Sequence, residues 1–304
     1  MLWLLITILA YLFLALASLA DRYLLVGPLK DPKSYAFFVG LFGMFSLVLV
    51  PFGFEIPAPN QIFLSLSAGV IWIFAIFLLY SAILQSEVSK IVPAIGGFLP
   101  IFTFFISRVV FSQEAKISFF EILAFSFLVF GSVLISLEKK KEFLRRDIKL
   151  SGLCAFFFAI GFFLMKAVYL QQTFISGFIW MRFGGIIFSL LLLIFPEVRK
   201  IVFSQGIVKK TQISLPLVLG QIAGGVGFML QSFAVFLASP GQLPMINALE
   251  GIRYAFLLFF VLILSKISPQ ILKEQISGKM LLQKVLAIGF IGIGLALMAF
   301  NRAY

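Results

Sequence analysis

Histidine is absent from this 304-residue sequence, cysteine occurs once, at Cys154, and only 12% of the residues are charged. Histidine general bases, disulfides and zinc sites built from His or Cys are therefore excluded. The sequence also has no close pair of carboxylates and no GxxxxGK loop, which argues against acid–base catalysis and ATP binding. We therefore expect a protein that is not an enzyme and that needs no metal or cofactor.

Apolar residues dominate what is present. The chain is 62% hydrophobic with a mean hydropathy of +1.14, and its 40 phenylalanines are too many for one soluble core. A bilayer core about 30 Å thick needs roughly 20 apolar residues per helix. Period-two alternation is absent, so an all-α polytopic membrane protein is predicted. Ten transmembrane helices are expected, at residues 2–20, 35–52, 62–84, 91–111, 117–137, 150–170, 173–195, 215–238, 243–265 and 285–300.

The second five apolar stretches repeat the first five. A constant offset of 151 residues pairs Gly69 with Gly220, Ser81 with Ser232 and Pro93 with Pro244, and an offset of 163 pairs Gly131 with Gly294. Because each unit has an odd number of helices, the second copy must enter the membrane upside down. We predict two inverted five-helix repeats, residues 1–137 and 150–304, joined by the charged linker 138–149.

Several short motifs recur in a fixed order along the chain. They are Glu87-Val88-Ser89-Lys90-Ile91-Val92-Pro93, Pro100 and Ser112-Gln113-Glu114 in the first half, and Ser239-Pro240, Pro244 and Lys273-Glu274 in the second. In this order, and with five-plus-five helices, the chain resembles EamA-type members of the drug/metabolite transporter superfamily. The resemblance implies ten helices around a central cavity, alternating access, and export or exchange of small metabolites.

The basic residues are distributed unevenly between the two sets of loops. Eighteen lie in the loops after the odd-numbered helices and at most four, namely Arg108, Lys116, Lys166 and Arg302, lie on the other side. Positive-inside counting predicts that the basic loops are cytoplasmic and both termini are outside, whereas the resemblance implies termini in the cytoplasm. The same loops account for the +12 net charge, so we expect contact with anionic membrane lipids and no binding of nucleic acid. A short surface helix is expected within 266–284.

Two arginines fall inside predicted spans, Arg182 in the seventh and Arg253 in the ninth. A charge at the bilayer centre costs about 3 kcal/mol, so each should face protein or a wet cavity. Near Arg253, polar or small residues follow i, i+3, i+4, i+7 spacing: Asn247, Glu250, Gly251 and Tyr254. Glu250 and Arg253 are then either part of a solute-binding cavity or a structural ion pair within one helix.

Aromatic and amide side chains could complete such a cavity, namely Gln221, Gln231, Trp72, Tyr80 and Trp180. The excess positive charge favours a small-molecule substrate that is anionic or carries a carboxylate. Glycine runs at 220–227 and 289–294 are expected to permit close helix approach. The prediction is a secondary transporter of a small organic metabolite in the cell membrane; the alternatives are a lipid or glycolipid translocator and a membrane assembly protein without transport activity.

Overall fold

The computed structural model describes residues 2–26, 32–86, 88–111, 118–136, 145–203, 215–267 and 278–300. These residues are helical almost throughout and contain no strand, which confirms the all-α prediction. The long helices are α1 (Leu2–Val26), α2 (Pro32–Leu41), α3 (Pro59–Gln85), α4 (Val88–Val110), α5 (Phe119–Ser136), α6 (Arg145–Tyr169), α7 (Phe174–Leu191), α10 (Leu215–Leu237), α12 (Glu250–Ile267) and α13 (Gly278–Phe300). Shorter elements are η1 (Phe42–Phe52), η2 (Leu192–Ile194), α8 (Pro196–Phe203), η3 (Pro240–Gln242) and α11 (Leu243–Ala248).

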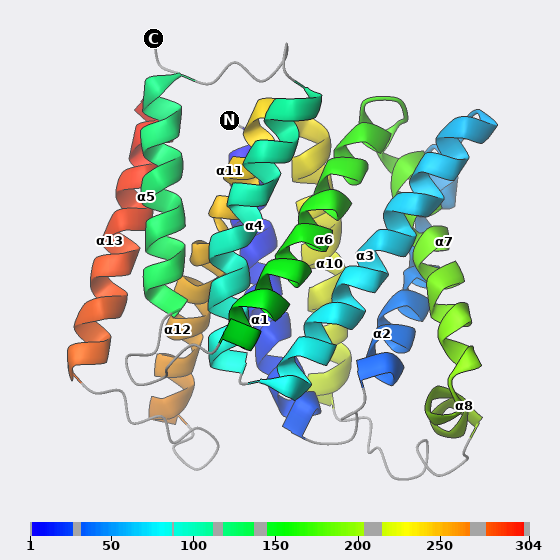
Figure 1. Cartoon of the computed structure of the whole chain (residues 1–304), viewed down its shortest axis with the longest axis horizontal. Coiled ribbons are helices and arrows are strands. Elements are labelled where there is room, and N and C mark those ends of the chain that lie inside the picture. The colour runs from blue at the N-terminus through cyan, green and yellow to red at the C-terminus, as the bar shows by residue number, and fades with distance from the viewer. Residues whose placement is uncertain are drawn as a thin grey trace.

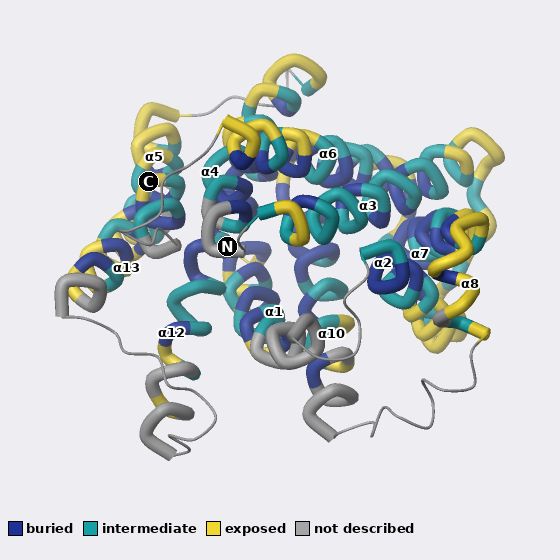
Figure 2. Tube along the Cα trace, turned by 60° about the horizontal axis from the view of Figure 1, so that its bottom comes forward, coloured by how far each residue is buried: buried dark blue, intermediate teal, exposed yellow. Residues whose placement is uncertain are grey.

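The long helices lie side by side in one bundle, with the start of α1 and the end of α13 at the same end and α8 at the opposite end (Figure 1). Five segments of the described chain are long and apolar enough to cross a membrane: Pro32–Phe52, Pro59–Gln85, Arg145–Tyr169, Phe174–Ile194 and Pro240–Phe260. Five further apolar helical stretches of 10–17 residues accompany them. Exposed residues lie along the outer helices of the bundle (Figure 2). Many of the exposed residues are large and hydrophobic, as a lipid-facing surface requires.

Three boundaries differ from the sequence-based expectation. The second predicted span changes from an α-helix to a 3₁₀-helix at Phe42 and ends at Gly53, whose φ of 117° is a left-handed conformation that favours glycine. The helix α6 begins at Arg145, inside the expected linker, and a carboxylate in its first turn, Asp147, favours this start; Asp147 also accepts a hydrogen bond from the Ser86 hydroxyl, 2.6 Å away. The short helix α8 follows α7, where no helix was predicted; the surface helix expected within 266–284 falls largely on residues outside the described ranges.

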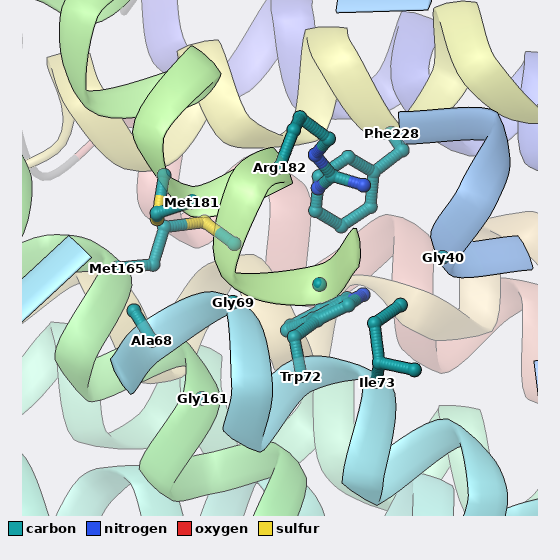
Figure 3. Close-up of a pocket in the computed structure, with 11 residues that line it drawn as sticks. Gly40, Ala68, Gly69, Trp72, Ile73, Gly161, Met165, Met181, Arg182 and Phe228 are labelled. Carbon is teal, nitrogen blue, oxygen red and sulfur yellow. The ribbon is translucent and has the colours of Figure 1, made fainter. Parts of the chain in front are cut away.

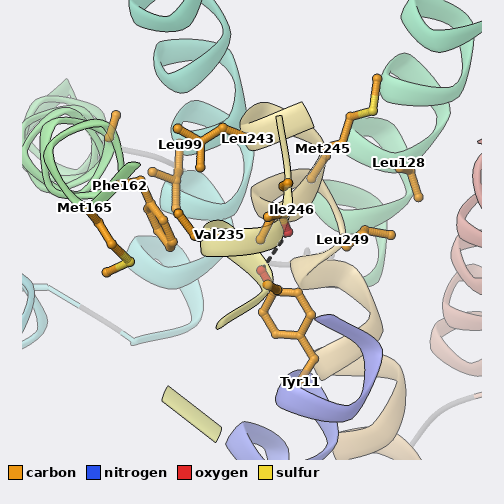
Figure 4. Close-up of a cluster of buried hydrophobic side chains, with 14 of the residues drawn as sticks. Tyr11, Leu99, Leu128, Phe162, Met165, Val235, Leu243, Met245, Ile246 and Leu249 are labelled. Atoms are coloured by element: carbon orange, nitrogen blue, oxygen red, sulfur yellow. Dashed lines mark hydrogen bonds between the residues drawn. The ribbon is translucent and has the colours of Figure 1, made fainter. Parts of the chain in front are cut away.

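The ninth predicted span is interrupted at Leu249, where α11 ends and α12 begins. A hydroxyl from another helix occupies the interruption: Ser132 of α5 donates to the carbonyl oxygen of Ala248 at 2.7 Å and accepts the N–H of Gly251 at 2.9 Å. The Tyr11 hydroxyl of α1 donates to the carbonyl oxygen of Ile246 at 2.8 Å (Figure 4). Two side chains from distant helices therefore satisfy backbone groups at the break, which is how a kink is stabilised in an apolar interior.

The main contacts of the bundle join helices that are not consecutive in the sequence. The helix α1 packs on α10 and α12, and α6 packs on α3 and α4. The helix α4 also contacts α11, α2 contacts α7, and α5 packs along α13. The largest buried cluster joins these helices around Ile91, Leu128, Val168, Ile246 and Leu249, all fully buried (Figure 4 shows part of it). Segments far apart in the sequence thus share one core.

The contact between α5 and α13 is reciprocal. A Cβ added at Gly131 would meet Ile291 and the carbonyl oxygen of Ala287, and one added at Gly294 would meet Leu128 and the carbonyl oxygen of Ala124. With the offset of 163 residues that pairs Gly131 with Gly294, Ala124 corresponds to Ala287 and Leu128 corresponds to Ile291. The two helices are therefore antiparallel and use equivalent residues on both sides of their contact.

The glycine runs only partly serve close packing. Gly224 lies against Ala17, and a Cβ at Gly227 would lie 3.1 Å from the carbonyl oxygen of Ala10, so both adjoin α1. A Cβ at Gly225, Gly289 or Gly292 would meet no atom within 4 Å. The expectation that both runs as a whole permit close approach is therefore wrong for these three positions, which face open space. The closest approach lies elsewhere, where Gly69 and Gly184 bring α3 and α7 into backbone contact.

Candidate functional site

Arg182 lies near the middle of α7 and projects among aromatic rings. Its guanidinium carbon is 3.9 Å from the ring centroid of Phe228 on α10 and 5.0 Å from that of Phe178 on α7. Its buried Nε donates no hydrogen bond, and no carboxylate lies within ion-pair distance among the described residues. Cation–π contacts of this kind contribute up to about 2 kcal/mol when desolvated, which offsets part of the cost of the charge. The arginine thus has aromatic neighbours but no counter-charge in the described chain.

A small cavity of about 10 Å³ lies beside this arginine (Figure 3). That is room for about one water molecule. Its lining comes from five helices: Gly40 of α2, Ala68, Gly69, Trp72 and Ile73 of α3, Gly161 and Met165 of α6, Met181, Arg182 and Gly185 of α7, and Phe228 of α10. The Trp72 ring meets Phe228 edge-on with centroids 4.9 Å apart, so the two predicted site residues Trp72 and Arg182 share one aromatic wall. The Arg182 side chain as a whole is half-buried beside this wall.

Glu250 and Arg253 form a second polar group, at the start of α12. Arg253 Nη1 lies 3.6 Å from Glu250 Oε1, and the two side chains are 28% and 16% exposed. The other edge of the guanidinium is fixed by α1, since Nε and Nη2 donate to the Ser18 hydroxyl at 3.1 Å and 2.6 Å. That hydroxyl in turn donates to the Leu14 carbonyl oxygen at 2.7 Å. Arg253 is thus anchored to α1 while its contact with Glu250 is long for a charge-assisted hydrogen bond.

Two tyrosines and a glutamine complete this group. The hydroxyl of Tyr254 is buried beside Glu250 without a hydrogen bond of regular geometry, and its ring contacts Gly96 of α4. Gln231 of α10 is 8% exposed and donates from Nε2 to the Tyr11 hydroxyl at 3.5 Å. The structure therefore brings Glu250, Arg253, Tyr254 and Gln231 together around α1, which supplies Tyr11 and Ser18.

The residues predicted to share one helix face, Asn247, Glu250, Gly251 and Tyr254, contact different helices. Asn247 is fully buried on α11 and donates from Nδ2 to the Thr103 hydroxyl of α4 at 2.9 Å, while its Oδ1 has no partner. Gly251 faces Ser132 of α5 instead. The interruption at Leu249 separates Asn247 from the Glu250–Arg253 pair, so the residues spaced along one segment do not all face one space.

Two predicted aromatic residues lie toward α2 and η1. The ring of Tyr80 on α3 lies 4.1 Å from that of Tyr35 on α2, and the Trp180 ring stacks 6.1 Å from Phe54, just after η1. Neither lines the cavity beside Arg182. Gln221 lies within α10, and its side chain is outside what the structure describes.

Sequence reasoning did not identify Tyr11, Ser18, Thr103, Ser132 and Phe228. A signal existed for the first two, because Thr7, Tyr11 and Ser18 follow i, i+4, i+11 spacing and share one face of an apolar helix. Ser132 and Phe228 carry no such signal, since single serines and phenylalanines are frequent in this chain.

No family model and no curated protein matches the sequence. One solved structure, described only as the crystal structure of a protein, is similar over 98% of this chain and 96% of its own, with a TM-score of 0.65 and 14% identity. This comparison establishes the fold alone. It extends over essentially the whole bundle, so the arrangement of helices around Arg182 and Arg253 belongs to a fold that another protein shares.

The chemistry available at these positions is electrostatic. At the two groups described above, two guanidinium groups and one carboxylate have described side chains, which leaves an excess of one positive charge among them. Hydroxyl groups of Ser18, Tyr11 and Tyr254 lie around one guanidinium, and aromatic rings surround the other. No group of three or more potential metal ligands occurs among the described residues. Such an arrangement can bind an anion and can exchange a proton at Glu250.

Proposed function

We propose that this chain is a secondary transporter that moves a small organic anion across a membrane by alternating access. The observation that carries the proposal is Arg182, which projects from the middle of a membrane-spanning helix into a small cavity without a counter-charge among the described residues. A structural arginine in a bilayer is normally paired, because an unpaired charge there costs about 3 kcal/mol. A solute carboxylate would supply the missing charge.

The pattern of helix contacts supports two inverted halves. If α1 corresponds to α6, α3 to α10, and α4 to α11 with α12, then the pair α1–α10 corresponds to α6–α3, and α1–α12 to α6–α4. The pairs α2–α7, α4–α11 and α5–α13 each join corresponding helices. The reciprocal contact of Gly131 and Gly294 has the antiparallel geometry that a two-fold axis in the membrane plane produces. Transporters built this way place their site between the halves near the midplane.

One departure from that correspondence concerns α3 and α7, which pack closely, whereas α10 and α2 do not form the equivalent contact. A transporter that alternates between two states needs such a difference between its halves in each state. We infer that the close contact at Gly69 and Gly184 shuts one side of the pathway in this conformation.

The charges at the two ends of the bundle support an orientation. Among residues whose side chains are described, Lys33, Arg145, Arg146, Lys149, Arg199, Lys200 and Lys284 lie toward the end that carries α8, and Arg108 and Lys166 lie toward the other. We propose that the α8 end is cytoplasmic and the termini are outside. The Lys166 ammonium is buried and donates to the carbonyl oxygens of Val235 and Phe236, at the end of α10, so it stabilises a helix terminus.

An uptake screen of small carboxylates and other metabolites in proteoliposomes tests the proposal. We expect at least one anionic solute to enter with the wild type, and its uptake to fall at least tenfold with Arg182→Gln. The matched control is Arg199→Gln, which removes an exposed arginine on α8 and should leave uptake unchanged. Translocation of fluorescent phospholipid or glycolipid without solute uptake would instead identify a lipid translocator. Absence of both activities would favour an assembly role.

A further inference from the structure

Glu250 differs from the other described carboxylates in its position. It is the eleventh residue of the 21-residue apolar segment Pro240–Phe260, and therefore lies at its centre. Glu250 begins α12 but lies in mid-segment, whereas the other carboxylates with described side chains lie at or beyond an end of an apolar segment, namely Glu55, Glu121, Asp147 and Glu197. An ionisable side chain at such a depth is expensive to keep charged, and it marks an ion pathway or proton relay unless it is firmly paired.

The pairing of Glu250 is loose on every side. Among the described residues its ionic contact is with Arg253 Nη1 at 3.6 Å, whereas charge-assisted N–H···O bonds are about 2.7–2.9 Å long. The buried Tyr254 hydroxyl lies beside this carboxylate but makes no hydrogen bond of regular geometry with it. Arg253 does not depend on Glu250 for its position, because two of its nitrogens are held by Ser18. The pair can therefore open without moving the guanidinium.

The ionisable neighbours of Glu250 are few. Among the described side chains they are Arg253 and Tyr254 on its own helix and Tyr11 on α1. The nearest turns of α5 and α13 present Ser132 and Ile291, which do not ionise, and Gly96 of α4 faces the Tyr254 ring. Of the cations in the described part of the chain, Arg253 is thus the one that faces the carboxylate, and the whole chain contains no histidine that could carry a proton instead.

We propose that Glu250 is a proton-binding site that exchanges its ion pair with Arg253 for a proton when an organic anion binds Arg253. The anion takes the Nη1 edge that Glu250 occupies in this structure, and one proton adds to a carboxylate oxygen of Glu250. No other bond forms or breaks, and the anion and the proton together add no net charge to the bundle. An unpaired carboxylate in an apolar interior binds a proton because its charged form loses solvation. The coupling to an anion rests on the proposed function; the proton site does not.

Infrared spectra of the protein in lipid nanodiscs, recorded from acidic to alkaline buffer, test the proton site without any substrate. A protonated carboxyl group in an apolar environment has a distinct carbonyl band that shifts in D₂O. We expect one such band in acidic buffer with the wild type and its loss with Glu250→Gln. Glu197→Gln, which removes an exposed carboxylate on α8, is the control and should retain the band.

Variants at Arg253 test the exchange. Arg253→Gln removes the competing cation, so the band should already be present in neutral buffer, whereas Arg253→Lys should behave as the wild type. If Glu250→Gln alone does not fold, the double variant Glu250→Gln/Arg253→Gln, which has no buried charge at this site, replaces it as the reference. Identical spectra of wild type and reference at every pH would overturn the proposal, as would a missing band in neutral Arg253→Gln. A failed uptake screen with the band intact would reject only the transport function.

Discussion

The Ser132 hydroxyl on α5 accepts the backbone N–H of Gly251, 119 residues further along the chain, and replaces the hydrogen bond that a continuous helix would make there. The residue that aligns with Gly251 in the first half, at an offset of 151, is Pro100 of α4, which has no N–H to satisfy. Both helices therefore lack the regular backbone bond at this level. In α12 the consequence is a break directly before Glu250.

Replacing Ser132 by alanine should lower stability, because the Gly251 N–H and the Ala248 carbonyl would both lose their partner. An unsatisfied buried polar group costs about 1–3 kcal/mol, so the midpoint of thermal unfolding in detergent should fall by several degrees. The control is Ser126→Ala on the same helix. The exposed Ser126 hydroxyl donates to the Ile122 carbonyl oxygen one turn earlier in α5. Equal midpoints for the two variants would show that the hydroxyl is dispensable.

A methyl group at Gly251 should be poorly tolerated. An added Cβ would overlap Ser132 Oγ and would lie 2.9 Å from the Ser132 Cα and 2.8 Å from Ile291 Cδ1, so the backbone must shift. Gly251→Ala should therefore destabilise the protein by about 1–3 kcal/mol, the usual cost of overpacking. Gly225→Ala is the control, because a Cβ added there would meet no atom within 4 Å and alanine is the better helix former by about 1 kcal/mol. A change in stability of the same sign in both variants would contradict this packing.

Alanine at Gly131 and alanine at Gly294 should have similar effects. Each added methyl group would press on an equivalent leucine or isoleucine and on an equivalent alanine carbonyl of the facing helix. We expect both to lower the unfolding midpoint by comparable amounts, and Gly289→Ala on α13 to have little effect, since that position faces open space. A large loss at one of the two glycines alone would argue against equivalent halves.

The pair of Glu250 and Arg253 can be assigned to a site or to a structural role by two variants. If Arg253 binds the solute, Arg253→Gln should abolish transport with nearly unchanged folded yield, because Glu250 can bind a proton. If the pair is structural, removal of one partner should cost about 3–5 kcal/mol and reduce expression. Recovery of both stability and transport in the Glu250→Gln/Arg253→Gln double variant would reject the solute-binding role.

Cysteine labelling tests the orientation. In a Cys154→Ser background, a single cysteine at Phe203, an exposed position on α8, should resist an impermeant thiol reagent in intact cells and react after lysis. A cysteine at Ile56, 79% exposed at the opposite end, should react in both. The reverse pattern would place the termini in the cytoplasm, as the resemblance to EamA-type transporters implies.

Much of the fold follows from apolar runs, because lipid demands a continuous helix wherever about 20 apolar residues occur together. The centres of α3, α6 and α7 lie where that rule puts them. The break at Leu249 could not be foreseen, since it depends on Ser132 and Tyr11 from distant helices. The positions of Tyr80 and Trp180 were also beyond prediction, because helix rotation is decided by packing between neighbours that are equally apolar in sequence.

The matching surfaces of α5 and α13 are self-complementary, as in the interface of a two-fold homodimer. Each surface presents a glycine, the backbone carbonyl of an alanine and a branched side chain at equivalent positions. The glycine of each helix contacts the alanine carbonyl and the branched side chain of the other, antiparallel helix. A single five-helix unit carrying this surface could therefore pair with a second, oppositely oriented copy of itself. If the chain joins two such copies, as proposed above, their ratio is fixed and each copy is free to vary, so that one can carry Glu250 and Arg253 where the other has Leu99 and Phe102.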